Sequence, residues 1–128
     1  MLKYKKRGEN MLFGKKEIIK SKEINEAYKE FEKDTSIILL CVDELVTFDE
    51  CHPVGAQCFP LRIIEDEAER QLDKDLKYYI YALRKGTSYT ATKKLMKLGY
   101  EAYDLGSSIP FRGPEEGFHK KNRKKRKK

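Results

Sequence analysis

Residues 37–42, with the sequence Ile-Ile-Leu-Leu-Cys-Val, constrain the fold of this chain more than any other segment. All six residues are apolar, three are β-branched, and no polar residue alternates with them. Such a strand is typical of a parallel sheet that helices cover on both faces. A bilayer span needs roughly 20 apolar residues, so this run predicts a core strand and not a membrane helix.

The segments beside this strand predict further helices and strands. Residues 17–20 predict a short strand, and Ser21 stands in a typical N-cap position before a helix whose apolar residues recur as far as Phe31. Residues 65–76 predict a short exposed helix with an acidic start. Residues 78–81, Tyr-Tyr-Ile-Tyr, predict a second buried strand.

The C-terminal part continues the same alternation. A short loop at residues 82–88 leads into a helix that carries Ala91 and Leu95, Gly99 ends this helix, and residues 101–105 predict a last strand. Strand, helix and strand in this order imply right-handed βαβ crossovers. The sequence therefore predicts an α/β fold, a single domain with an open, mostly parallel sheet flanked by helices.

The charge of the chain is divided unevenly. Residues 1–16 carry six basic groups and one acid, residues 17–118 carry 14 basic groups and 20 acids, and residues 119–128 carry eight basic groups and no acid. We therefore expect a basic N-terminal extension (1–16), a mildly acidic folded domain (17–118) and a disordered basic tail (119–128). Residues 1–16 lack the apolar stretch of a secretory signal, so we expect the protein in the cytoplasm.

The basic tail predicts an electrostatic partner. Eight cations in ten residues attract a polyanion such as RNA, the ribosome or an anionic membrane surface, without sequence specificity. The alternative is that the tail only increases solubility. The predicted polyanion-binding residues are Lys120, Lys121, Arg123, Lys124, Lys125, Arg126, Lys127 and Lys128.

Three cysteines, Cys41, Cys51 and Cys58, form an odd set that excludes a fully paired disulfide framework. Cys51 and Cys58, with the adjacent His52, offer a single C-x6-C spacing, whereas zinc sites usually show two close-spaced pairs. We therefore expect no metal site, and no motif indicates an organic cofactor.

The loop at residues 82–88 is the candidate binding site. Ligands in open parallel sheets bind at the carboxyl ends of the strands, and the N–H groups at the start of a helix hold anions. The alternative is that Ser88 is an N-cap and the basic residues are solvated. The predicted anion-binding residues are Arg84, Lys85, Gly86, Thr87 and Ser88.

Three motifs in order give residues 37–113 a resemblance to a known family. Residues 52–56, His-Pro-Val-Gly-Ala, precede a Phe-Pro-Leu at 59–61 and resemble a G-H-I-P-G-A-x-x-x-P-L signature. The second motif is the 78–81 strand with its following loop, and the third is residues 98–106 with Ile109. Together they resemble a rhodanese-like domain, which implies the small α/β sulfurtransferase fold.

The departures from that family bear on activity. Active members place a nucleophilic cysteine at the first position of the loop, where this chain has Ala82 or Leu83 depending on the alignment. The family's D-V-R triplet reads Cys41-Val42-Asp43. The resemblance therefore implies a catalytically inactive domain that acts as a binding or regulatory module. Two alternatives stay open: a sulfurtransferase that uses Cys51 or Cys58, and polyanion binding through the tail.

Overall fold

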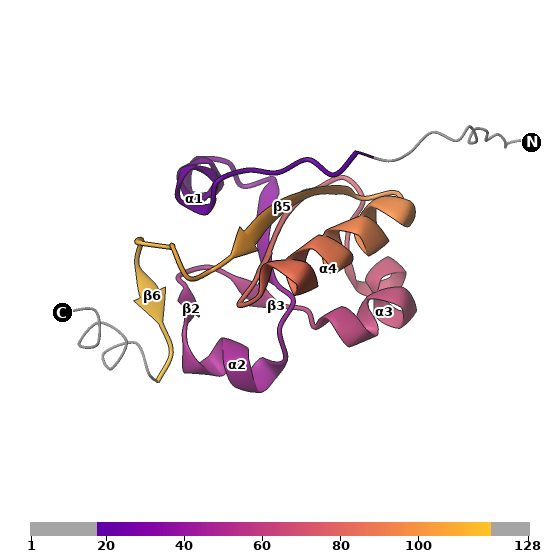
Figure 1. The fold of residues 1–128 in the computed structure, drawn as a ribbon. Coiled ribbons are helices and arrows are strands. Elements are labelled where there is room, and N and C mark those ends of the chain that lie inside the picture. The colour runs from indigo at the N-terminus through magenta and orange to yellow at the C-terminus, as the bar shows by residue number, and fades with distance from the viewer. Residues whose placement is uncertain (1–17, 119–128) are drawn as a thin grey trace, which may run out of the picture.

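The computed structural model describes residues 18–118, which form an α/β domain around a four-stranded parallel sheet (Figure 1). The segments 1–16 and 119–128, with their predicted roles, lie outside the described residues. The helices are α1 (Ile24–Lys33), α2 (Leu45–Glu50), α3 (Ile64–Gln71) and α4 (Lys85–Lys97), with a 3-10 turn at Leu61–Ile63. The strands are β1 (Ile37–Cys41), β2 (His52–Pro53), β3 (Gln57–Cys58), β4 (Lys77–Ala82), β5 (Glu101–Ser107) and β6 (Glu115–Glu116).

The main sheet has the strand order β3-β1-β4-β5, and all of its pairs are parallel. The carboxyl ends of the four strands therefore meet at one edge, which we call the carboxyl edge. The predicted α/β class and parallel sheet are confirmed. A separate antiparallel pair joins β2 to β6, with His52 opposite Glu116.

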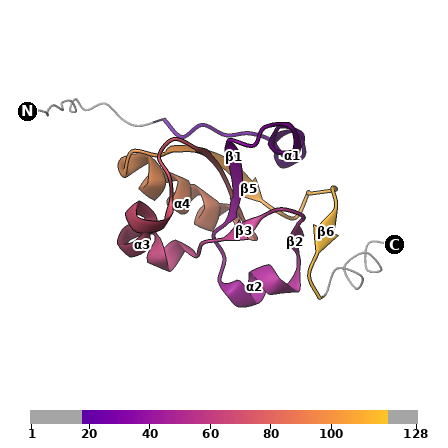
Figure 2. The same cartoon turned by 180° about the vertical axis from the view of Figure 1, so that it is seen from behind.

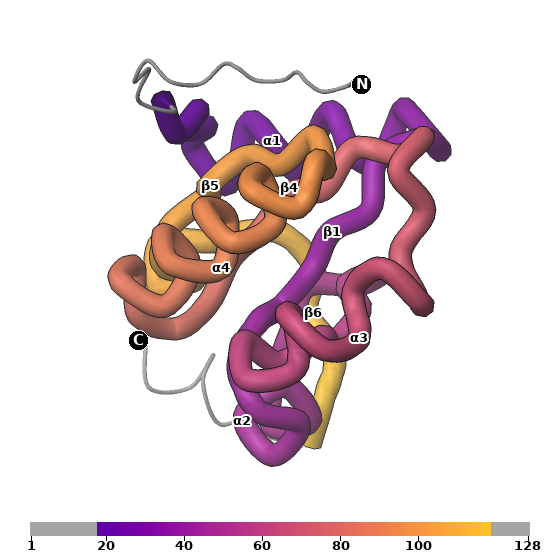
Figure 3. The backbone as a smooth tube through the Cα atoms, turned by 90° about the vertical axis from the view of Figure 1, so that its right-hand side faces the viewer, coloured from indigo at the N-terminus to yellow at the C-terminus, as the bar shows by residue number. Residues whose placement is uncertain are grey.

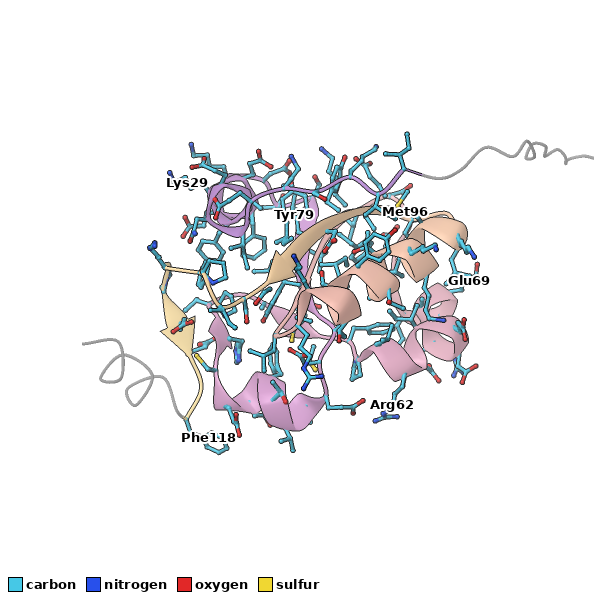
Figure 4. The ribbon with its side chains drawn as sticks, viewed as in Figure 1. Lys29, Arg62, Glu69, Tyr79, Met96 and Phe118 are labelled. Atoms are coloured by element: carbon cyan, nitrogen blue, oxygen red, sulfur yellow. The ribbon has the colours of Figure 1, made fainter. Side chains whose placement is uncertain are left out.

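Helices cover both faces of the sheet, as the apolar run at residues 37–42 predicts. Side chains of β1 alternate between the two faces, so that Leu39 packs on the α1 side and Leu40 packs on the side of α3 and α4. Figures 1 and 2 show α1 on the opposite side of the strands from α3 and α4. In Figure 4, Tyr79 of β4 lies on the side of α1, in agreement with its place in that cluster.

Three boundaries differ from the predictions. Residues 18–20 form no strand, because Ser21 makes only an isolated bridge to Asp104 at the edge of β5. The N-cap of α1 is Glu23, whose carboxylate accepts a hydrogen bond from the Glu26 N–H.

The predicted helix at residues 65–76 is shorter. It ends at Gln71, because Leu72 leaves the helical conformation after its N–H donates to the Ala68 carbonyl.

Within residues 18–118, no helix has the length and apolar character of a membrane span.

Candidate functional site

The connection from β4 to α4 at the carboxyl edge is very short. Ala82 ends the strand, Lys85 begins the helix, and only Leu83 and Arg84 lie between them. Arg84 occupies the N-cap position and makes no side-chain cap hydrogen bond. The first-turn N–H groups of α4 therefore have no side-chain cap. N–H groups at the start of a helix can bind an anion.

Ser88 lies one turn inside α4, so the interpretation of this residue as the N-cap is wrong. Its side chain is fully buried, and its hydroxyl lies 3.0 Å from the Ile80 carbonyl and 2.5 Å from Asp104 Oδ1. The hydroxyl therefore joins α4 to β4 and β5. The Ser88 N–H donates to the Arg84 carbonyl at 3.3 Å, so Ser88 can act on an anion only by positioning the start of α4.

Lys85 and Gly86 line a cavity of about 510 Å³ between the start of α4 and the edge of β5. Lys22, Tyr89 and Asp104 are among the other lining residues. The Lys22 ammonium forms an ion pair with Glu30 at 3.2 Å, which leaves Lys85 as the cavity cation without an ion pair among residues 18–118. The Asp104 carboxylate also accepts a hydrogen bond from the Gly106 N–H at 2.9 Å.

The two positions at which the sequence resemblance predicts the nucleophile have different environments. Ala82 is fully buried in the cluster between the sheet and α3 and α4. Leu83 is 44% exposed at the carboxyl edge. An aliphatic side chain at either position offers no lone pair for attack on sulfur.

Two of the cysteines lie directly opposite each other on neighbouring strands, Cys41 on β1 and Cys58 on β3. Burial raises the pKa of the Cys41 thiol to about 12. The pKa of Cys58 is also raised, first by burial and then by the nearby carboxylates of Asp49, Glu44 and Asp43. Because the thiolate is the nucleophile, both thiols are poorly reactive near neutral pH. Cys51 lies apart from this pair, at the C-terminal end of α2.

Asp43 connects the ends of three strands, a role that the sequence analysis did not predict. Its Oδ2 accepts a hydrogen bond from the Leu83 N–H at 2.8 Å and from the Cys41 thiol at 3.6 Å. Its backbone carbonyl accepts a hydrogen bond from the Cys58 thiol at 3.5 Å. The sequence feature that could have pointed to Asp43 is its place as third residue of the Cys41-Val42-Asp43 triplet, where the family pattern has arginine.

The hydroxyl of Tyr81 is buried beside this carboxylate. The side chain is 2% exposed, and among the described residues its oxygen has no nitrogen or oxygen partner, only the weakly hydrogen-bonding Cys41 thiol beside it. Burial raises the pKa of Tyr81 far above its ordinary value, and the neighbouring Cys41 thiol contributes in the same direction. No cluster of three or more His, Cys, Asp or Glu residues suited to a metal ion occurs in residues 18–118.

Comparison with known proteins identifies the fold. No family model matches the sequence, and no curated protein matches it. A protein from Bacillus halodurans of known crystal structure is 21% identical, with a TM-score of 0.71 over 78% of each chain. The rhodanese-like domain of an Anabaena protein is 21% identical, with a TM-score of 0.70 over 80% of this chain and 82% of that one.

A third solved structure is a rhodanese with anions from E. coli. It is 20% identical, with a TM-score of 0.57 over 63% of this chain and 98% of that one. These similarities confirm, at the level of the fold, the resemblance found in the sequence. Residues 18–118 therefore form a domain with the rhodanese-like fold.

Proposed function

We propose that this chain is a binding or regulatory module that keeps the rhodanese-like fold but does not transfer sulfur. The observation that carries this proposal is the apolar start of the β4–α4 loop, where Ala82 is fully buried and Leu83 follows it. A sulfur acceptor at this position would need a thiolate. The raised pKa of Cys58 argues against one form of the alternative, a sulfurtransferase that uses Cys58, and the assay below tests Cys51 as well.

The ligand that we propose for this module is a small anion held at the start of α4. The residues that we assign to it are Arg84, Lys85, Gly86 and Thr87, and Ser88 takes part by fixing the start of α4 against β4 and β5. Lys85 and Gly86 line the cavity beside β5, and the helix dipole adds positive potential there. The solved E. coli rhodanese with anions supports by analogy only the class of ligand, because it is similar to this chain in fold.

A thiosulfate-to-cyanide sulfur-transfer assay tests the loss of activity. We expect no turnover by the natural chain, and turnover by either Ala82→Cys or Leu83→Cys, since each variant restores a thiol at one of the two candidate positions. The variant that gains activity identifies which of the two residues occupies the position of the nucleophilic cysteine in active rhodaneses. Turnover by the natural chain would contradict the proposal, and Cys51→Ser and Cys58→Ser would then identify the nucleophile.

Sulfate binding, measured by NMR titration, tests the anion site separately. Lys85→Glu should weaken binding by about tenfold or more, because two charge units change beside the ligand. Lys97→Glu at the other end of α4 makes the same charge change and serves as the matched control. Equal effects of the two variants would show that only the net charge matters.

A further inference from the structure

Three parallel strands of this domain each lead into an exposed aliphatic residue at the carboxyl edge. Leu45 follows β1 and is 56% exposed, Leu83 follows β4 and is 44% exposed, and Ile109 follows β5 and is 65% exposed. Val46, beside Leu45, is 73% exposed. We call these four residues the aliphatic row. In an open parallel sheet this edge is where ligands bind, yet here large apolar side chains face solvent.

Hydrogen bonds hold the members of the aliphatic row near one another. The Leu83 N–H donates to Asp43 Oδ2 at 2.8 Å, two residues before Leu45. On the other side, the Ser107 hydroxyl donates to the Leu83 carbonyl at 2.8 Å and accepts from the Ile109 N–H at 3.1 Å. Leu83 therefore lies between the segment that begins α2 and the segment that follows β5.

Helix α2 contributes Leu45 and Val46 to this surface. None of its six residues is fully buried, and Phe48 alone of its apolar side chains packs against the core, where it stacks on His52. In Figure 3, α2 lies at the end of the molecule away from α1, and Figure 1 shows it below the sheet at the same end. Adjacent exposed aliphatic residues such as Leu45 and Val46 are typical of a surface that a partner covers.

The charges beside the aliphatic row have opposite signs on its two sides. On the β1 and β3 side, Asp49 and Glu50 of α2 are exposed, and Asp49 is close enough to raise the pKa of Cys58 on β3. On the β5 side, Lys85 lines the cavity that Gly106 also lines. None of the ion pairs within residues 18–118 uses these three charged residues.

We propose that the aliphatic row is the interface between two copies of this chain in a two-fold symmetric dimer. A two-fold axis near Leu83 brings the acidic side of one copy against the basic side of the other. Leu83 then packs on its own equivalent, and Leu45 and Val46 of each copy pack on the partner's Ile109. In the same arrangement, Lys85 of each copy faces Asp49 and Glu50 of its partner. An isologous interface requires this self-complementarity, and a bilayer would not use the acidic side.

Sedimentation velocity of the full-length chain across a concentration range tests the proposal. We expect a concentration-dependent dimer, and we expect Leu83→Glu or Val46→Glu to raise the dimer dissociation constant at least tenfold. Both residues are exposed, so circular dichroism should report an unchanged fold. Ile18→Glu is the matched control, because Ile18 is 79% exposed but lies outside the row.

A charge exchange tests the orientation of the two copies. Lys85→Glu and Asp49→Lys should each weaken the dimer, and the double variant should recover at least part of the loss, since the pair is restored with reversed signs. A monomer at all concentrations would overturn the proposal, as would an effect of Ile18→Glu equal to that of Leu83→Glu. A complex with a different protein but no dimer would also overturn it. Measurements in chloride buffer without sulfate keep this test separate from the anion site.

Discussion

Replacement of Tyr81 by phenylalanine should stabilise the domain. The Tyr81 side chain is 2% exposed, and within residues 18–118 its hydroxyl has no nitrogen or oxygen partner, only the weakly hydrogen-bonding Cys41 thiol. Burial of a hydroxyl without a partner costs about 1–3 kcal/mol, while the aromatic ring keeps its apolar contacts in the variant. We therefore expect Tyr81→Phe to raise the free energy of unfolding by about 1 kcal/mol, which is roughly 3–6 °C in Tm for a domain of this size.

Tyr78 on the same strand provides the matched control. It is 1% exposed, and its hydroxyl donates to the Asp73 carbonyl and accepts from the Asp73 N–H, both at 2.9 Å. Tyr78→Phe removes the same atom but breaks two hydrogen bonds, so we expect a loss of about 1–3 kcal/mol. The two variants should therefore shift stability in opposite directions.

Urea denaturation followed by circular dichroism measures both variants. The slope of the free energy of unfolding against urea should stay unchanged, so that a shift in midpoint reports stability alone. If Tyr81→Phe destabilises the domain as much as Tyr78→Phe does, the Tyr81 hydroxyl has a stabilising partner. That result would refute the reasoning from its burial.

Three further predictions concern pH, glycine and the tail. The pKa of Cys41 is raised from 9.0 to about 12 in the folded state, so the stability that this shift contributes is complete well below pH 9 and is lost above it. The loss is about 1 kcal/mol between pH 9 and 10 and approaches about 1.4 kcal/mol per pH unit above that. Urea midpoints between pH 9 and 10 should therefore fall less steeply for Cys41→Ala. In thermal unfolding, Gly117→Ala should destabilise the domain by about 2 kcal/mol or more, because φ is +124° and the new Cβ would lie 2.7 Å from the Glu50 carbonyl oxygen. The control Gly86→Ala should be neutral or slightly stabilising, because its new Cβ meets no atom within 4 Å. Removal of residues 119–128 should abolish RNA retention at low salt in filter binding; unchanged retention would assign the polyanion site to another part of the chain.

The sequence was most informative where short-range pattern decides structure. The apolar run at residues 37–42 predicts a doubly covered strand, and the structure places its side chains in two separate clusters, one on each face. Gly99 predicts the end of a helix, and α4 ends at Lys97 with Gly99 at a φ of +96°. Such features depend on neighbours within one or two turns, so a single sequence suffices to predict them.

Elements that depend on pairing with a distant segment could not be predicted in this way. Strand β2 exists because His52 and Pro53 pair with Glu116 and Glu115, more than 60 positions later. Likewise, the N-cap of α1 is Glu23 and not the predicted Ser21, because residues 20–22 hydrogen-bond along the edge of β5. No local propensity records a partner so far along the chain.

The sequence by itself determined the fold class, the buried strands and the absence of a cysteine at the start of the 82–88 loop. Only the tertiary structure decided what surrounds that loop: the Asp43 carboxylate on the Leu83 N–H, the buried hydroxyls of Ser88 and Tyr81, and the exposed aliphatic row. The physical reason is the distance along the sequence between the residues that decide each feature. Backbone conformation and apolar periodicity depend on neighbouring residues. The environment of a side chain at the carboxyl edge depends instead on contacts between different elements, such as those of Asp43 and Leu83, which lie 40 positions apart.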